Sequence, residues 1–215
     1  MKLQTASRSL QALVLATLAG ASAHGALIVS NLSEASAGSL GVGFTINATS
    51  FTTGPSGGTL DAITILVEEP ATTIHFTGSI WSNSSAVPPG LPGSQLFTLG
   101  TTSPSTGGSA SYVSLQFTPP STVNLSANTQ YFFVLTADDG DALVSTTNSA
   151  NQTGSGGWLI GDDLFTDNSP WAVTEAGRAI RFSADFTAVP EPAETAAALS
   201  AGLVGFALWR RRARR

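Results

Sequence analysis

Carboxylates gather at two places in this chain, each next to glycine or small polar residues. The first is Asp138-Asp139-Gly140-Asp141, and the second is Asp162-Asp163 with Asp167-Asn168 shortly after it. Hard oxygen ligands on a flexible loop suit Ca²⁺, which takes about six to eight of them. The candidate ligands of a structural Ca²⁺ are therefore Asp138, Asp139, Asp141, Asp162 and Asp163. Neither stretch has the full EF-hand spacing, and solvated turns are the alternative.

Tryptophan is the residue type here that could bind sugar rings. Trp81 is predicted on the polar face of a strand, beside a long turn-rich loop from Ser82 to Ser94. An exposed aromatic ring at such a place is a candidate sugar-binding platform. Trp158 and Trp171 are expected to cap the core instead.

No catalytic constellation is evident. His75 is the one histidine of the central region apart from His24, and it is expected to be an exposed strand residue. The chain has neither a G-x-S-x-G nor an H-E-x-x-H motif. It also has no cysteine, which excludes thiol catalysis, thiolate metal sites and disulfides. The chain is therefore predicted not to be an enzyme and to need no cofactor other than the candidate calcium ion.

Charge is distributed unevenly along the 215 residues. Of the 9 lysines and arginines, only Arg178 and Arg181 lie between residues 24 and 188, which contain twelve carboxylates. Two positive and twelve negative side chains give this region a formal charge of −10. Because phosphate backbones are bound by basic side chains, nucleic acid is excluded as a partner, and anionic lipid surfaces are excluded with it.

Short runs of alternating apolar and polar residues, separated by Gly, Pro and Ser clusters, fill this central region. The pattern predicts an all-β fold, an antiparallel β-sandwich of about nine to eleven strands with a jelly-roll-like topology. Residues 162–169 are predicted to form an acidic loop. The first and last strands are expected to be neighbours, so that the chain would leave at an edge of the sandwich. The predicted strands are Ala26–Val29, Gly43–Phe51, Leu60–Glu68, Thr72–Trp81, Gln95–Leu99, Ser111–Thr118, Gln130–Ala137, Ala142–Thr147, Trp158–Ile160, Trp171–Thr174 and Ala179–Thr187.

The N-terminal 23 residues have the features of a secretory signal peptide. Lys2 and Arg8 provide a basic start, an apolar stretch runs from Leu10 to Ala19, and Ala21-Ser22-Ala23 is a small-x-small cleavage site. We expect a signal helix that signal peptidase removes after Ala23. An N-terminal transmembrane helix is disfavoured because the apolar stretch is too short to span a bilayer.

The last 27 residues, 189–215, have three parts. Val189-Pro190-Glu191-Pro192 is followed by an apolar run from Ala193 to Trp209 and then by Arg210, Arg211, Arg212, Arg214 and Arg215. As a helix the apolar run would cover about 25 Å, at the short limit for a hydrocarbon core of about 30 Å. The arginines would stay cytoplasmic under the positive-inside rule. The pattern predicts a C-terminal transmembrane helix with everything before it outside.

This three-part tail resembles the PEP-CTERM sorting signal of Gram-negative exported proteins. The resemblance implies that an exosortase-like membrane protease cuts near Pro190-Glu191-Pro192. The protein would then be exported, held transiently in the inner membrane, and finally released or re-anchored at the cell surface or in the extracellular matrix. A plain single-span C-terminal anchor is the alternative.

Four stretches of residues 24–188 form a recognisable series. They are Phe51-Thr52-Thr53-Gly54, Leu60-Asp61-Ala62-Ile63, residues 125–135 and Gly157-Trp158-Leu159-Ile160-Gly161-Asp162. In these stretches the region resembles the exported modules called choice-of-anchor domains, most nearly the R type. That resemblance implies a β-rich exported domain with no established activity, so the expected role is a structural or adhesive component of the exopolysaccharide matrix. The alternative is a carbohydrate-binding module, and an enzyme is less favoured.

Overall fold

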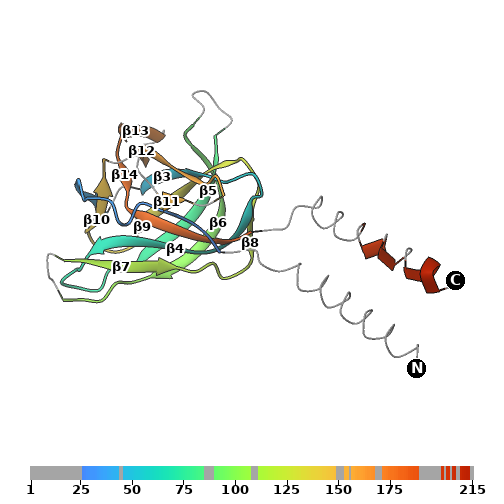
Figure 1. Cartoon of the computed structure of the whole chain (residues 1–215). Coiled ribbons are helices and arrows are strands. Elements are labelled where there is room, and N and C mark those ends of the chain that lie inside the picture. The colour runs from blue at the N-terminus through green and yellow to red at the C-terminus, as the bar shows by residue number, and fades with distance from the viewer. Residues whose placement is uncertain are drawn as a thin grey trace. The chain divides into compact units, whose positions relative to one another are not determined.

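A computed structural model describes residues 26–43, 46–84, 90–107, 111–148, 153–154, 156–167 and 171–188, and in the tail residues 200, 202–203, 205–206 and 209–213. Ala26–Ala188 form one compact unit that holds the described strands (Figure 1). Met1–Gly25 and Val189–Arg215 form a second unit, of which only the short tail segments are described.

The strands of the first unit form two antiparallel sheets. The nine-stranded sheet runs in the order β11-β1-β15-β4-β10-β14, with β2 paired to β10 and with β7 and β8 paired to β4. The six-stranded sheet runs in the order β13-β12-β3-β9-β5-β6. The larger sheet comprises β1 (Ala26–Ser30), β2 (Gly38–Val42), β4 (Gly58–Glu68), β7 (Tyr112–Phe117), β8 (Val123–Leu125), β10 (Ala142–Thr147), β11 (Thr153–Gly154), β14 (Ala179–Ile180) and β15 (Phe182–Thr187). The smaller sheet comprises β3 (Ile46–Thr52), β5 (Phe76–Asn83), β6 (Pro92–Thr102), β9 (Gln130–Ala137), β12 (Leu159–Asp167) and β13 (Trp171–Glu175).

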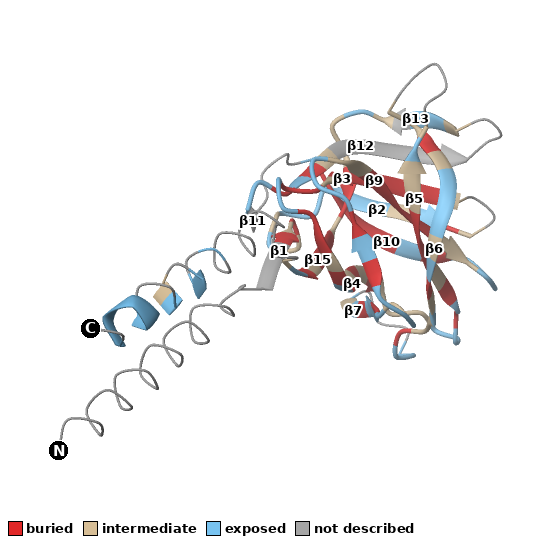
Figure 2. Ribbon diagram, turned by 90° about the vertical axis from the view of Figure 1, so that its right-hand side faces the viewer, coloured by how far each residue is buried: buried red, intermediate tan, exposed pale blue. Residues whose placement is uncertain are grey.

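The main core lies between the two sheets and is rich in phenylalanine. Successive side chains of a strand point to opposite faces, so every second residue of each inner strand enters this core. Phe51 of β3, Phe133 of β9 and Phe182 of β15 are fully buried and in ring contact. Figure 2 shows that the buried residues run along strands of both sheets. The predicted all-β sandwich is therefore confirmed.

The number of strands was underestimated. The structure has fifteen strands in the described residues, where about nine to eleven were predicted. β8 and β11 are only 3 and 2 residues long, and β2 has two glycines among its 5 residues, so none of the three produces an alternating pattern. The predicted last strand is divided at Arg181, because β14 before it pairs with β10 whereas β15 after it pairs with β1 and β4.

The prediction of an acidic loop at residues 162–169 is wrong for the first six residues, which belong to β12. The backbone of β12 continues as a strand to Asp167 and pairs with β3 on one side and β13 on the other. The ladder shifts register between Ile160 and Leu164, so the acidic stretch falls at a β-bulge. Backbone pairing to two neighbours decides the structure here, and the charge pattern that suggested a loop does not.

The first and last strands are neighbours, as predicted. β1 pairs with β15 along its whole length, and Ala26 is directly opposite Thr187. Within the larger sheet, β15 lies between β1 and β4. The unit's first and last strands therefore start and finish side by side.

The two predicted terminal helices fall almost entirely outside the described residues. Tail residues 200, 202–203, 205–206 and 209–213 are helical. Within the parts of the chain that the structure describes, no helix has the length and apolar character needed to cross a membrane.

Trp158 fills one end of the main core. Its side chain is 2% exposed, and its ring centroid lies 3.8 Å from that of Phe186. A methyl group on Gly58 would come within 3.2 Å of the indole, and one on Gly54 within 2.8 Å of it. Small residues at these two positions therefore make room for the large ring.

Replacing Trp158 with alanine should leave a cavity that its neighbours cannot fill. We expect Trp158→Ala to lower the free energy of unfolding by about 3–5 kcal/mol, measured by urea denaturation. Trp209→Ala removes the same side chain from the tail and should leave the denaturation midpoint unchanged. A loss below about 1 kcal/mol for Trp158→Ala would show that this end of the core is loosely packed.

Candidate functional site

The outer face of the six-stranded sheet carries a second apolar cluster. Ala48 of β3 and Phe132 and Val134 of β9 are at most 1% exposed, although they point away from the main core. The outer face of a sheet is usually polar, so a buried cluster there needs a cover. The cover consists of four partly buried side chains, namely Ile46, Trp81, Leu91 and Trp171.

Trp81 is fixed within this cluster by two contacts. Its indole Nε1–H donates to Ser79 Oγ at 2.9 Å, two residues back on the same face of β5. Its ring also packs against Trp171, with ring centroids 5.8 Å apart and an angle of 77° between the ring planes. The predicted sugar-binding residue is therefore a half-buried ring held in one orientation, and its main partner is Trp171.

The contact between Trp171 and Trp81 requires the sheet to coil. β13 and β5 are four strands apart, which amounts to roughly 19 Å in a flat sheet with strands about 4.8 Å apart. The two residues are also offset along the strands, since Trp171 is in register with Asp167 and Ile46, whereas Trp81 is opposite Phe132. The sheet's twist must therefore bring β13 over the outer face.

A polar row lies beside the two tryptophans. Asn83 Nδ2 donates to Gln130 Oε1 at 2.8 Å, and Asn83 Oδ1 accepts from the backbone N–H of Gly90 at 3.0 Å. Gln130 is also paired with Thr52, which is in turn opposite Leu159. The row thus combines amide and hydroxyl groups with an exposed leucine, and it adjoins the Trp81 position on the same face.

The Asp138–Asp141 turn is bound to the start of β5. His75 donates from its backbone N–H to Asp139 Oδ1 at 2.6 Å, and its ring Nδ1 lies 2.7 Å from Asp139 Oδ2. These bonds hold the pKa of the Asp139 carboxyl below its usual value, the backbone bond contributing most. Thr77 Oγ1 donates to Asp138 Oδ2 at 2.7 Å. His75 is thus exposed as predicted, but it precedes β5 instead of lying within a strand, and it is paired with a carboxylate.

The structure does not gather the predicted calcium ligands into a described site. Among the side chains that it places, no group of three or more histidine, aspartate or glutamate residues could hold a metal ion. The carboxylates of Asp138 and Asp139 instead accept hydrogen bonds from Thr77 and His75. The side chains of Asp162 and Asp163 lie outside the described residues. The calcium site therefore stays a prediction, and it depends on where these two carboxylates lie.

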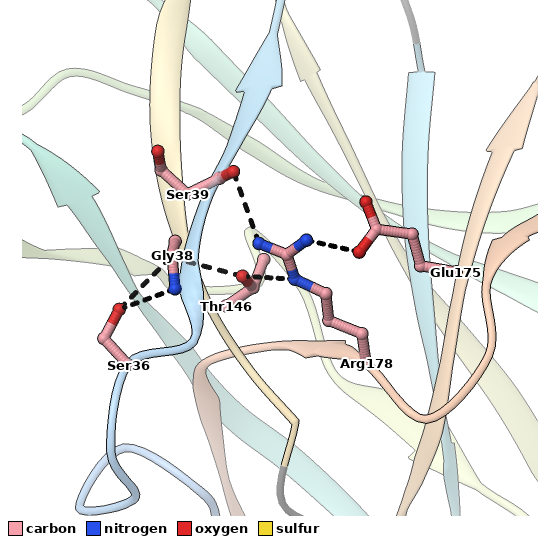
Figure 3. Close-up of polar contacts among 6 residues, drawn as sticks. All are labelled: Ser36, Gly38, Ser39, Thr146, Glu175 and Arg178. Carbon is pink, nitrogen blue, oxygen red and sulfur yellow. Dashed lines mark hydrogen bonds and ion pairs between the residues drawn. The ribbon is translucent and has the colours of Figure 1, made fainter.

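Both arginines of the central region are used inside the fold. Arg178 Nε donates to Thr146 Oγ1 at 2.8 Å, while its terminal nitrogens bind Glu175 and the carbonyl oxygen of Ser39 (Figure 3). Arg181 donates to Ser145 Oγ at 3.3 Å and to the carbonyl oxygen of Leu32. One guanidinium therefore connects β2, β10 and the turn after β13, and the other connects β10 to the turn after β1.

Sequence reasoning missed three of these arrangements: the Trp81–Trp171 pair, the His75–Asp139 pair and the Arg178 network. Each arrangement includes a contact between residues that are 32 or more positions apart in the sequence. The spacing of neighbouring residues therefore could not have predicted them. One signal was present. Residues 131–135 of β9 are apolar on both faces, which indicates that both faces of the strand are covered.

The predicted processing sites cannot be placed. Ala21, Ala23 and the motif from Val189 to Pro192 lie outside the described residues, as do Arg214 and Arg215. Arg210, Arg211 and Arg212 are helical and exposed.

Asp185 of β15 is a partly buried carboxyl next to Asp61 of β4. Burial, and after it the charge of Asp61, raises the pKa of Asp185 above its ordinary 3.8. Asp61 itself accepts a hydrogen bond from Thr187 Oγ1 at 2.8 Å. Because the folded chain binds the Asp185 proton more tightly than the unfolded chain, stability falls as pH rises from 3.8 through the raised pKa.

Asp185→Asn should remove this unfavourable charge. We expect a higher melting temperature than that of the wild type at pH 7, with the difference shrinking as the pH is lowered towards 3.8. Glu34→Gln, a carboxyl-to-amide change elsewhere on the unit, serves as the control. A melting temperature at pH 7 equal to or below that of the wild type would contradict this assignment.

Arg178→Ala should destabilise the fold, because it removes three hydrogen bonds at once, two of them partly buried. The expected loss is about 1–3 kcal/mol in the free energy of unfolding, measured by urea denaturation. Arg178→Lys keeps the charge but not the planar fork, and should also lose stability. Arg210→Ala is the matched control. An Arg178→Lys variant as stable as the wild type would show that charge alone is needed here.

Neither a scan against protein-family models nor a search of curated proteins found a match to this chain.

Proposed function

We propose that this is an exported, non-enzymatic protein of the cell surface or the extracellular polysaccharide matrix, delivered by a C-terminal sorting signal of the PEP-CTERM type. Its body, residues 24–188, would be a choice-of-anchor domain with a jelly-roll-like topology. Signal peptidase and an exosortase-like protease would be its processing partners, and the inner membrane its transient site.

The observation that carries the proposal is the position of the two processing sites relative to the strands. The signal-peptide cleavage site after Ala23 lies three residues before β1 begins at Ala26. The sorting motif begins at Val189, two residues after β15 ends at Thr187. Cutting at either site would remove a terminal segment and leave the strand ladder complete.

The pairing of β1 with β15 supports delivery on a single tether. Ala26 is directly opposite Thr187, so the domain's two ends lie together in the larger sheet. A tail held in the membrane would then attach the domain at one place, and the rest of its surface would stay free. This arrangement suits a structural or adhesive role.

The chemistry of the described side chains favours a role without catalysis. His75 is hydrogen-bonded to an exposed aspartate, and the two arginines bind within the fold. The domain folds without a disulfide, by burial of its apolar side chains. Such a domain can work outside the cell without depending on the redox state of its surroundings.

Intact-mass analysis of the exported protein tests this proposal. Loss of residues 1–23 and of the mass beyond Pro192 is the expected result. Changing Pro190, Glu191 and Pro192 together to alanine should leave the arginine tail attached and the protein in the inner membrane. Pro119→Ala with Pro120→Ala, a double change in the body, should be processed normally.

A wild-type protein that keeps its five C-terminal arginines would contradict the sorting proposal. In that case the tail would be an ordinary single-span anchor. A protein that keeps residues 1–23 and stays in the cytoplasm would contradict export altogether.

A further inference from the structure

The two indole rings on the outer face of the six-stranded sheet remain available for contact. Trp81 and Trp171 meet edge to face, an arrangement in which the edge of one ring covers only one face of the other. Both side chains are partly exposed. Because the Trp81 indole N–H donates to Ser79, the ring is fixed before any ligand arrives, which lowers the entropy cost of binding.

Hydrogen-bonding groups lie within reach of the same surface. Gln130 is two residues from Phe132, the cross-strand partner of Trp81, and shares its face of β9. Its Oε1 accepts from Asn83, while in the described part of the chain its Nε2 has no hydrogen-bond partner. A planar amide held by a neighbour, with free N–H groups, can donate to a ligand hydroxyl.

The three central strands of this face contribute no charged side chain, and at one end Asp138 accepts a hydrogen bond from Thr77. Alternate residues of β3, β5 and β9 point outward here, and every one of them is apolar, a hydroxyl or an amide. They are Ile46, Ala48, Ser50, Thr52, Thr77, Ser79, Trp81, Asn83, Gln130, Phe132, Val134 and Thr136. The domain around them has two arginines against twelve carboxylates, so an acidic chain would be repelled and a neutral one would not.

We infer that this face binds a neutral polysaccharide chain. Sugar rings present C–H groups on their faces and hydroxyls at their rims, so they would stack on Trp81 and Trp171 and accept hydrogen bonds from Gln130. The inference rests on the proposed function, since a protein delivered to the matrix meets polysaccharide there. The sequence alone suggested that Trp81 would bind sugar by itself. The site inferred from the structure has two tryptophan rings, and its ligand is a neutral polysaccharide.

Native affinity electrophoresis of the exported protein tests the inference. Gels would contain hydroxyethylcellulose or dextran as neutral polymers, or alginate as an acidic one. We expect at least one neutral polymer to retard the protein and alginate not to do so. Trp171→Ala should weaken the association at least about tenfold, and Gln130→Ala about threefold.

Two controls separate binding from folding. Gln116→Ala makes the same change as Gln130→Ala on the exposed side of β7, in the other sheet, and should bind like the wild type. Gln130→Ala leaves the apolar cluster intact, so it tests the face even if Trp171→Ala fails to fold.

Three results would overturn the inference: no retardation by either neutral polymer, equal retardation by alginate, or wild-type binding by both variants. A protein that is exported and processed but is not retarded overturns this inference alone. A protein that keeps its full mass contradicts the sorting proposal, while the binding measurement remains valid.

Discussion

The burial of β9 on both faces is the constraint on which the rest of the domain depends. Phe133 and Leu135 point into the main core between the sheets, while Phe132 and Val134 point outward and are equally buried. Each buried side chain of this size stabilises the fold by about 1.5–3 kcal/mol relative to leaving it exposed. The outer pair must therefore be covered, and the cover decides the shape of the six-stranded sheet.

Trp81 and Trp171 provide that cover, and the sheet coils to bring them together. The same contact that stabilises the outer cluster also creates a surface of two fixed rings beside the Asn83–Gln130 pair. Structure and function are linked through one requirement. The four side chains that cover Phe132 include two aromatic rings, and both rings stay partly exposed.

Charge in this domain follows a similar logic. With only two cations, the fold uses both internally, Arg178 to join β2 with β10 and Arg181 to join β10 with the turn after β1. Carboxylates such as Asp139 and Asp185 lie in turns or on the larger sheet, while Asp162, Asp163, Asp167 and Glu175 lie in β12 and β13 at one edge of the smaller sheet. The central strands β3, β5 and β9 therefore present uncharged outward side chains on an acidic domain, and this contrast is the basis of our inference of a neutral partner.

Local patterns predicted β9 and β10 with their correct limits. The clearest alternation, predicted as a strand over Thr72–Trp81, gave the wrong limits, because β5 runs from Phe76 to Asn83. Patterns failed where pairing between distant segments decides the outcome. β12 pairs with β3 on both sides of the irregularity that contains Asp162 and Asp163, and with β13 from Leu164 onward. The contact between Trp81 and Trp171 could not be predicted. It depends on how far the sheet coils, and the sequences of the individual strands do not determine that.

The most direct test of this account is an NMR titration of the three indole Nε1–H signals of the domain with a neutral oligosaccharide, cellohexaose or maltohexaose. Trp81 and Trp171 lie on the proposed face, whereas Trp158 is buried in the main core. The account predicts that the signals of Trp81 and Trp171 shift together and saturate while that of Trp158 stays in place. Signals of Trp81 and Trp171 that do not move with either sugar would contradict it.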